Sequence, residues 1–262
     1  MSAERIPVLM YHRIGDAKND WERKYCVSAE CFEAQMKAMA RAGWHAVPSA
    51  DFCNWLAGGK PLPEKSFVLT FDDGFLSVHE HAAPVLRALK WPATVFLVSQ
   101  LIGQRDIWCA AHNPSGETYP LMTMGHISEL RGAGFTFHSH TRTHADLTTL
   151  DDDALQDQLT GSRTDLEALI GEPVPLLAYP YGRHDGRVVA AAERAGYRFA
   201  FSVQPGFNRR DVSAFRIRRL DVFGTDTPSM LLRKIQLGSN DGSLGAWARY
   251  CIIQILARLG IR

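Results

Sequence analysis

Short apolar runs alternate with amphipathic segments along most of this 262-residue chain, and that alternation restricts the folds open to it. The runs that predict strands cover residues 6–11, 45–47, 67–71, 93–98, 135–138, 175–179, 199–203 and 215–220. The segments that predict helices cover residues 28–41, 49–56, 75–89, 126–132, 151–170 and 186–195, and residues 101–123 predict a long loop. Alternating strands and helices form a parallel sheet covered by helices. We therefore expect a single-domain α/β fold, a closed or incomplete (β/α) barrel of mostly parallel strands with outer helices.

Composition agrees with one globular domain, which we place at residues 1–240, followed by a C-terminal helix over residues 241–262. The hydrophobic content of 46% and the charged content of 22% are ordinary for such a domain. The formal net charge of +1 provides no basic field, so we expect no nucleic-acid partner. The five cysteines form no CxxC pair, and the N-terminus lacks the apolar core of a signal peptide. These features favour a cytoplasmic location.

Two polar motifs follow predicted strands and carry the side chains of a metal site. Asp72 and Asp73 end the third predicted strand, and His140 and His144 follow the fifth. One carboxylate and two imidazoles can hold a divalent metal and leave coordination positions open, while the second carboxylate can take a proton from water. Each motif alone is also typical of a turn, a helix N-cap or surface histidines. Their occurrence at two strand ends favours the metal site, because α/β enzymes place their chemistry there.

The sequence resembles the polysaccharide deacetylase family, carbohydrate esterase family 4, over residues from about 6 to 225. Residues 70–74, Thr-Phe-Asp-Asp-Gly, match the first motif of that family. Residues 140–144, His-Thr-Arg-Thr-His, match its histidine motif in the variant with three intervening residues. Residues 179–182, Tyr-Pro-Tyr-Gly, look like its third motif. The first two matches are specific and the third is moderately so.

The resemblance implies a role for each motif residue. Asp73, His140 and His144 would bind a divalent metal, with Zn²⁺ expected first and Co²⁺, Ni²⁺ or Mn²⁺ as alternatives. Asp72 would act as the general base on water. The backbone N–H of Tyr181 would stabilise the oxyanion beside the metal.

The acid that protonates the leaving amine is less obvious. The family often takes it from an apolar-x-x-His motif near the C-terminus, but no histidine follows His184 in this chain. Residues 9–12, Leu-Met-Tyr-His, have that pattern at the N-terminus, as in the circularly permuted branch that includes poly-N-acetylglucosamine deacetylases. We therefore predict His12 as the acid. His184 is the rival acid, and a structural role in the core is the other interpretation of His12.

The choice of histidine ligands leaves one alternative open. His138 and His140 lie two residues apart on an extended segment, so they share a face. A His138/His144 pair is therefore a second possible ligand set, although the five-residue motif favours His140.

The third motif of the family usually carries an arginine that holds the catalytic base, and here Ala178 occupies that position. Arg216 and Arg218 share one face of the last predicted strand, and Arg219 and Asp221 share the other. One of these arginines could replace the missing one, or the strand could simply present a solvated face.

We expect a metal-dependent hydrolase that removes an N-acetyl group from an amino sugar, a glycan or a lipid-linked glycan. A deformylase or a cyclic-amide hydrolase would use the same residues on another amide. A non-catalytic carbohydrate-binding protein is the third possibility, but pure binding has no use for a general base beside a metal. The absence of a Gly-rich phosphate loop disfavours phosphoryl transfer.

The C-terminal segment 242–262 contains arginines but no acidic residue. At helical spacing, one stripe carries Leu244, Trp247, Ala248, Cys251, Ile252, Ile255 and Leu259. A basic helix with such a stripe can lie in a membrane interface. We therefore predict weak peripheral contact with the inner face of a membrane, with packing on the barrel or on another subunit as the alternative.

Overall fold

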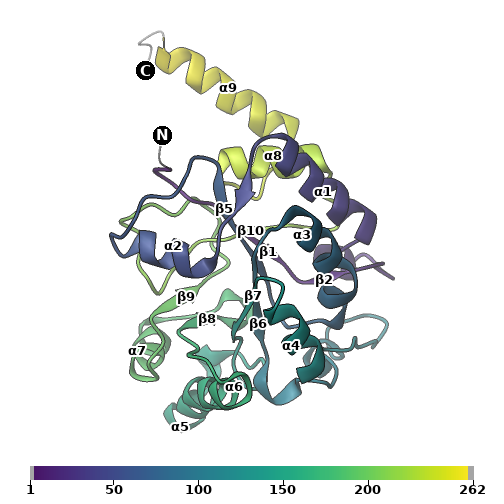
Figure 1. The fold of residues 1–262 in the computed structure, drawn as a ribbon, viewed down its shortest axis with the longest axis vertical. Helices are drawn as coiled ribbons and strands as arrows, with labels where there is room; N and C mark the ends of the chain where they lie inside the picture. Colours follow the sequence, from purple (N-terminus) through teal and green to yellow (C-terminus); the bar gives the residue numbers. More distant parts are fainter. Residues whose placement is uncertain (1–2, 259–262) are drawn as a thin grey trace.

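The computed structural model describes the backbone of residues 3–258 and the side chains of residues 3–253, and its centre is a parallel sheet (Figure 1). Seven strands pair in the order β10-β1-β5-β6-β7-β8-β9, and β4 adds to β5. Their bounds are β1 (Val8–Tyr11), β4 (His45–Ala46), β5 (Ser66–Phe71), β6 (Ala93–Leu97), β7 (Phe135–Ser139), β8 (Leu176–Ala178), β9 (Phe199–Phe201) and β10 (Leu220–Asp221). Every pair in this sheet is parallel, as the alternation predicts.

Helices connect the strands and surround the sheet (Figure 1). They are α1 (Ala29–Arg41), α2 (Ser49–Leu56), α3 (Ala83–Leu89), α4 (Met124–Arg131), α5 (Asp152–Gln156), α6 (Ser162–Ile170), α7 (Gly186–Arg194), α8 (Pro228–Leu237) and α9 (Leu244–Arg258). Polar N-caps begin several of them: Ser28 accepts from the N–H of Cys31 at α1, and Asp185 accepts from that of Val188 at α7. Such caps satisfy donors that the first helical turn leaves free.

The sheet curls until its two edges nearly meet. Phe201 of β9 forms a parallel bridge with Ile217, which lies just ahead of β10 on the other edge. Alternate strand residues then point into the barrel, where Phe96 and Phe201 pack with Trp55 of α2. The residues between them pack outward against the other helices. The predicted α/β class, an incomplete barrel of parallel strands, is thereby confirmed.

Some predicted elements need correction. The strand predicted at 215–220 is reduced to Leu220–Asp221 plus the single bridge at Ile217. Helix α8 and the paired strands β2 (Arg13–Ile14) and β3 (Cys26–Val27) were not predicted. The residues predicted as a loop at 101–123 contain a 3₁₀ turn, Ile107–Cys109. The strands and the 3₁₀ turn are too short to leave a local period in the sequence, whereas α8 is a ten-residue helix that went unrecognised.

Helix α9 projects from the body of the protein (Figure 1), and its predicted stripe divides between two faces. Trp247 and Tyr250 share a groove with Trp44 and Phe207, whereas Leu244 and Ile252 are exposed by 71% and 55%. The side chain of Ile255, and Leu259 altogether, lie outside the described residues. Across residues 3–258, no helix is long and apolar enough to span a membrane. The division into residues 1–240 and 241–262 stays a prediction.

Candidate active site

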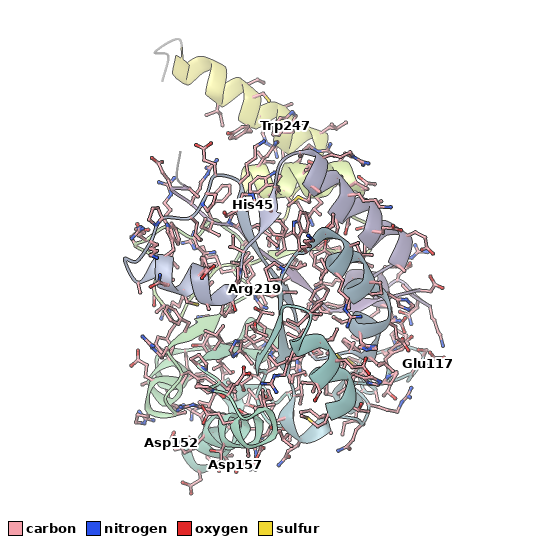
Figure 2. All side chains as sticks on the ribbon, in the orientation of Figure 1. His45, Glu117, Asp152, Asp157, Arg219 and Trp247 are labelled. Atoms are coloured by element: carbon pink, nitrogen blue, oxygen red, sulfur yellow. The ribbon has the colours of Figure 1, made fainter. Side chains whose placement is uncertain are left out.

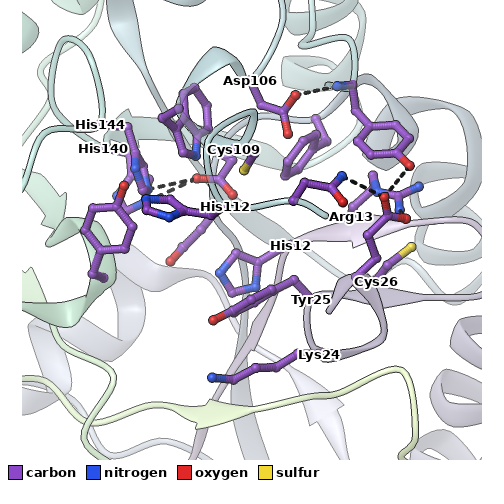
Figure 3. A pocket seen from close by; sticks show the side chains of 18 of the residues that line it. His12, Arg13, Lys24, Tyr25, Cys26, Asp106, Cys109, His112, His140 and His144 are labelled. Atoms are coloured by element: carbon purple, nitrogen blue, oxygen red, sulfur yellow. Dashed lines mark hydrogen bonds and ion pairs between the residues drawn. The ribbon is translucent and has the colours of Figure 1, made fainter. Parts of the chain in front are cut away.

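A cavity of about 380 Å³ opens at the carboxyl ends of the strands (Figure 3). Side chains that follow five different strands line it: His12 after β1, Asp72 and Asp73 after β5, His140 and His144 after β7, Tyr181 after β8, and Asp221 at the end of β10. Parallel strands bring their carboxyl ends to one edge, and this is why motifs far apart in the sequence meet.

The backbone of these motifs is unusual. Asp73, Thr141, His144 and Tyr181 all have positive φ values, of 73°, 69°, 63° and 57°. Non-glycine residues rarely adopt this left-handed conformation, and each such residue costs on the order of 1–3 kcal/mol unless its surroundings enforce it. Thr141 helps to enforce it, because its hydroxyl accepts a hydrogen bond from the N–H of His144 at 3.1 Å. Strained backbone of this kind gathers at functional sites.

Asp73, His140 and His144 form a compact buried group. Asp73 Oδ1 lies 3.5 Å from His140 Nε2 and 3.3 Å from His144 Nε2. Two ligand atoms at ordinary zinc distances of about 2.0–2.1 Å and a tetrahedral angle stand about 3.4 Å apart, so the spacing fits one shared cation. The Nδ1–H of His140 donates to the carbonyl of Ala178 at 2.8 Å, which leaves Nε2 free as the ligand atom.

The electrostatics of this group call for a positive charge. Within the described part of the chain, Asp73 Oδ1 is buried without a hydrogen-bond donor. Burial, followed by the neighbouring charges of Asp72 and Asp106, raises the pKa of Asp73 well above its usual value. Burial likewise lowers the pKa values of His140 and His144, which keeps both imidazoles neutral. A buried carboxylate beside two neutral imidazoles is the donor set that a divalent transition metal prefers.

Asp72 has a quite different environment, which Arg219 creates. The guanidinium of Arg219 donates two hydrogen bonds to the Asp72 carboxylate, Nη1 to Oδ1 at 2.6 Å and Nη2 to Oδ2 at 2.8 Å. Burial alone raises the pKa of Asp72, but the charge and hydrogen bonds of Arg219, together with the nearby His140 and His12, lower it to about 2. Asp72 is therefore ionised at any physiological pH.

Arg219 itself lies in the barrel interior, fully buried (Figure 2). Its Nε donates to the carbonyl of Ser202 at 2.9 Å, and the guanidinium lies over the ring of Phe96. Arg216 is exposed and Arg218 only half-buried. Of the three candidate arginines, the structure places Arg219 on the carboxylate.

The structure also separates the rival histidines. His12 lines the cavity, packs against the ring of Tyr25 and lies near Asp72 and Asp221. His184 does not line the cavity. It stacks on Tyr179, and its Nδ1 is bonded to the carbonyl of Gly182. His138 shares the inward face with His140, as predicted, but packs near Phe96 and lies outside the cavity lining.

The sequence analysis missed several residues of the cavity wall. Trp108 stacks on the imidazole of His144, with ring centroids 4.6 Å apart. Trp21 and Tyr25 line another part of the cavity, with their rings 5.6 Å apart. All three lie in segments without periodicity, and the position of Trp108 in a long loop was the one available signal among them. Aromatic rings are common walls of small-molecule sites.

The fold and the site together define an incomplete α/β barrel whose pocket holds paired carboxylates and a histidine pair, and comparison with known proteins gives the family. The family model described as polysaccharide deacetylase matches residues 59–200, more than half of the chain. The chain belongs to the polysaccharide deacetylase family, as its motifs predicted. His12, Arg219 and Asp221 lie outside the matched range.

Individual relatives agree with this assignment. YxkH of Bacillus subtilis, assigned to the polysaccharide deacetylases, is 27% identical over 218 residues, 83% of this chain and 71% of its own. The poly-beta-1,6-N-acetyl-D-glucosamine N-deacetylase of Staphylococcus epidermidis is 26% identical over 81% of this chain and 77% of its own. The deacetylase PplD of Streptococcus pyogenes has the same fold, with a TM-score of 0.76 over 90% of this chain and 99% of its own, at 21% identity.

Proposed function

We propose that this chain is a metal-dependent N-deacetylase that removes acetyl groups from the amino sugars of a glycan. One observation carries the proposal: two adjacent carboxylates in one pocket have opposite environments. Asp72 is held ionised by Arg219, while Asp73 Oδ1 is buried beside two neutral imidazoles. Paired carboxylates separated in this way divide between proton transfer and metal binding.

Asp73, His140 and His144 would hold the cation. A bound divalent cation polarises the acetamide carbonyl and makes water a better nucleophile at neutral pH. Asp72, fixed at both oxygens by Arg219, accepts the proton of the attacking water. Its orientation costs nothing at the moment of reaction, because the ion pair already holds it. The backbone N–H of Tyr181, in the cavity wall, is the proposed second donor to the oxyanion.

The amine leaves only after it receives a proton, and His12 is the proposed donor. Burial lowers the pKa of His12, while the carboxylates of Asp72 and Asp221 act in the opposite direction. The nearby acids therefore support the protonated imidazole that the step requires. His184 does not reach the cavity, so it is the weaker candidate.

The relatives support a glycan as the substrate. The Staphylococcus epidermidis protein is named for poly-beta-1,6-N-acetyl-D-glucosamine, and we propose a related N-acetylated glucosamine glycan for this chain. A formamide or a cyclic amide as substrate would use the same residues. Release of formate would identify a deformylase, and hydrolysis without release of a free acid would identify a cyclic-amide hydrolase. A non-catalytic carbohydrate-binding role would leave the ionised Asp72 without a purpose.

The metal is tested by exchange and substitution. Acetate release from N-acetylglucosamine oligomers should stop after chelation and return when Zn²⁺, Co²⁺, Ni²⁺ or Mn²⁺ is added. His140→Ala should lose the metal while staying folded, because the barrel core and not the ion holds the fold. Metal analysis and circular dichroism of the purified proteins measure both effects.

His138→Ala is the matched control for that experiment. It removes a buried imidazole from β7, the strand that His140 follows, and should keep the metal, since His138 lies outside the cavity lining. Full metal occupancy in His140→Ala, with loss in His138→Ala, would reverse the ligand assignment.

The acid is tested by the pH dependence of the metal-loaded enzyme. His12 can donate only while protonated, and burial lowers its pKa, so kcat should fall as the pH rises through that lowered pKa. His12→Gln should cut kcat by about 10²-fold or more and flatten this alkaline limb, with the metal retained. His184→Gln should leave the profile unchanged. A larger loss in His184→Gln would show that His12 only packs the core.

We further propose weak attachment to anionic bilayers through residues 242–262. Leu244, Ile252 and Ile253 are exposed on α9, and this segment has no acidic residue. The helix contacts Trp44, just before β4, whereas the cavity opens at the carboxyl ends of the strands. Attachment through α9 therefore leaves the pocket facing away from the bilayer, which favours a free glycan over a lipid-linked one.

Vesicle co-sedimentation tests this attachment. At low salt the full chain should sediment with phosphatidylglycerol vesicles, and a chain ending at Asp241 should not; high salt should release the full chain. If both stay in the supernatant at low salt, and the shorter chain loses its fold or its oligomer, the helix serves packing instead.

A further inference from the structure

Two loops that form much of the cavity wall meet at one buried glutamate. Glu22 is only 2% exposed, yet its carboxylate accepts four hydrogen bonds. Two come from its own loop, residues 13–27: Arg13 Nη2 at 2.7 Å and the N–H of Lys18 at 2.8 Å. Two come from the loop at residues 103–120: Asn113 Nδ2 at 2.9 Å and the hydroxyl of Tyr119 at 2.7 Å.

Other contacts run across the same junction. The guanidinium of Arg13 lies 3.6 Å from the ring centroid of Tyr119, and Asn19 donates to Asn113 Oδ1 at 2.9 Å. Lys18 forms a further ion pair with Glu117. The Glu22 carboxylate is the centre of this junction. One of its oxygens accepts from Arg13 and Lys18 in the first loop, and the other accepts from Asn113 and Tyr119 in the second.

The junction lies across the pocket from the metal group. Figure 3 shows Arg13 and Cys26 on one side of the cavity, with His140 and His144 on the other and His12 and Tyr25 between them. Residues of the junction itself line the cavity, Arg13 and Glu22 from the first loop and Asn113 and Tyr119 from the second. The joined loops therefore close the cavity at the end away from the metal group.

A closed end limits the substrates that fit. A long glycan that is deacetylated within its chain needs an open path on both sides of the reacting sugar. A cavity of about 380 Å³ lies near the lower end of the 300–1,000 Å³ typical of small-molecule pockets, and it accommodates a sugar at a chain end more readily than a continuous polymer. The exposed side chains of Tyr181 and Lys24 mark its rim.

We propose that Glu22 is a positioning residue that locks these two loops together, and that the closed pocket restricts the enzyme to short glycans and to the terminal sugars of longer ones. This inference rests on the proposed deacetylase function. It assigns to Glu22 no contact with the reacting atoms, only control over which sugars reach them.

The test uses the metal-loaded full chain and defined N-acetylglucosamine oligomers of two and six sugars. Wild type should act with the higher kcat/KM on the dimer, and mass-spectrometric sequencing of the hexamer should find the acetyl loss at a terminus. Glu22→Ala should raise the hexamer-to-dimer ratio of kcat/KM by about tenfold, mainly through KM, and should release acetate from internal sugars. Glu22→Gln, which keeps the shape but loses the charge, should fall between the two.

Glu167→Gln is the matched control. It breaks another arginine–glutamate pair, with Arg163, on helix α6 and outside the cavity lining, and should leave the ratio unchanged. Metal content equal to that of wild type shows that the Glu22 variants keep the site. Equal wild-type attack on internal and terminal sugars, or a Glu22→Ala ratio like that of wild type, overturns the proposal. No acetate from any oligomer would instead count against the deacetylase function itself.

Discussion

The buried ion pair between Arg219 and Asp72 is the interaction on which the site depends. Each charge alone would be costly in the barrel interior, because burial removes its hydration. Together they satisfy both carboxylate oxygens, and the remaining guanidinium N–H groups donate to Ser202 and lie near Thr70. The pair keeps Asp72 ionised and bonded to Arg219, in an environment different from that of Asp73. Without it, two adjacent carboxylates would compete for one proton or one cation.

The same ion pair links the chemistry to the closure of the barrel. Arg219 precedes β10 and Asp72 follows β5, and β1 lies between these two strands. Arg219 therefore links the start of β10 to the residue after β5, on either side of β1, the strand that His12 follows. A chain whose last strand did not return beside its first would lack both the arginine and the proposed acid at this place. The order of the strands thus brings the proposed base, its arginine partner and the proposed acid together from three distant parts of the sequence.

Much of this arrangement could be predicted from the sequence, because it follows from the hydrophobic periodicity of the elements and from the position of polar residues at strand ends. Strand ends identified the loops that carry Asp72, Asp73, His140 and Tyr181, and two-residue alternation placed His138 and His140 on one face. Alternation could not tell which of these histidines lies at the level of the pocket, since that depends on where the strand ends. It also grouped the arginines by face without showing which face is buried.

Most of the parts that were not predicted rest on contacts between distant residues. The junction at Glu22 joins segments about 90 residues apart through side-chain hydrogen bonds. Neither loop has a hydrophobic periodicity that would predict these contacts. Helix α8 had a readable start in Thr227 and Pro228, with Gly238 in the left-handed conformation at its end, and went unrecognised.

The most direct test of the central claim is the metal content and kcat of Asp72→Asn on an N-acetylglucosamine oligomer. If Arg219 and Asp72 serve proton transfer while Asp73 and the two histidines hold the cation, the variant keeps its metal and loses about 10²-fold or more in kcat. An Asp72→Asn, Arg219→Met double variant removes the unpaired buried charge and shows whether the loss is one of chemistry or of folding. An Asp72→Asn enzyme within a few-fold of wild type, or one that has lost its metal while still folded, would contradict this division of roles.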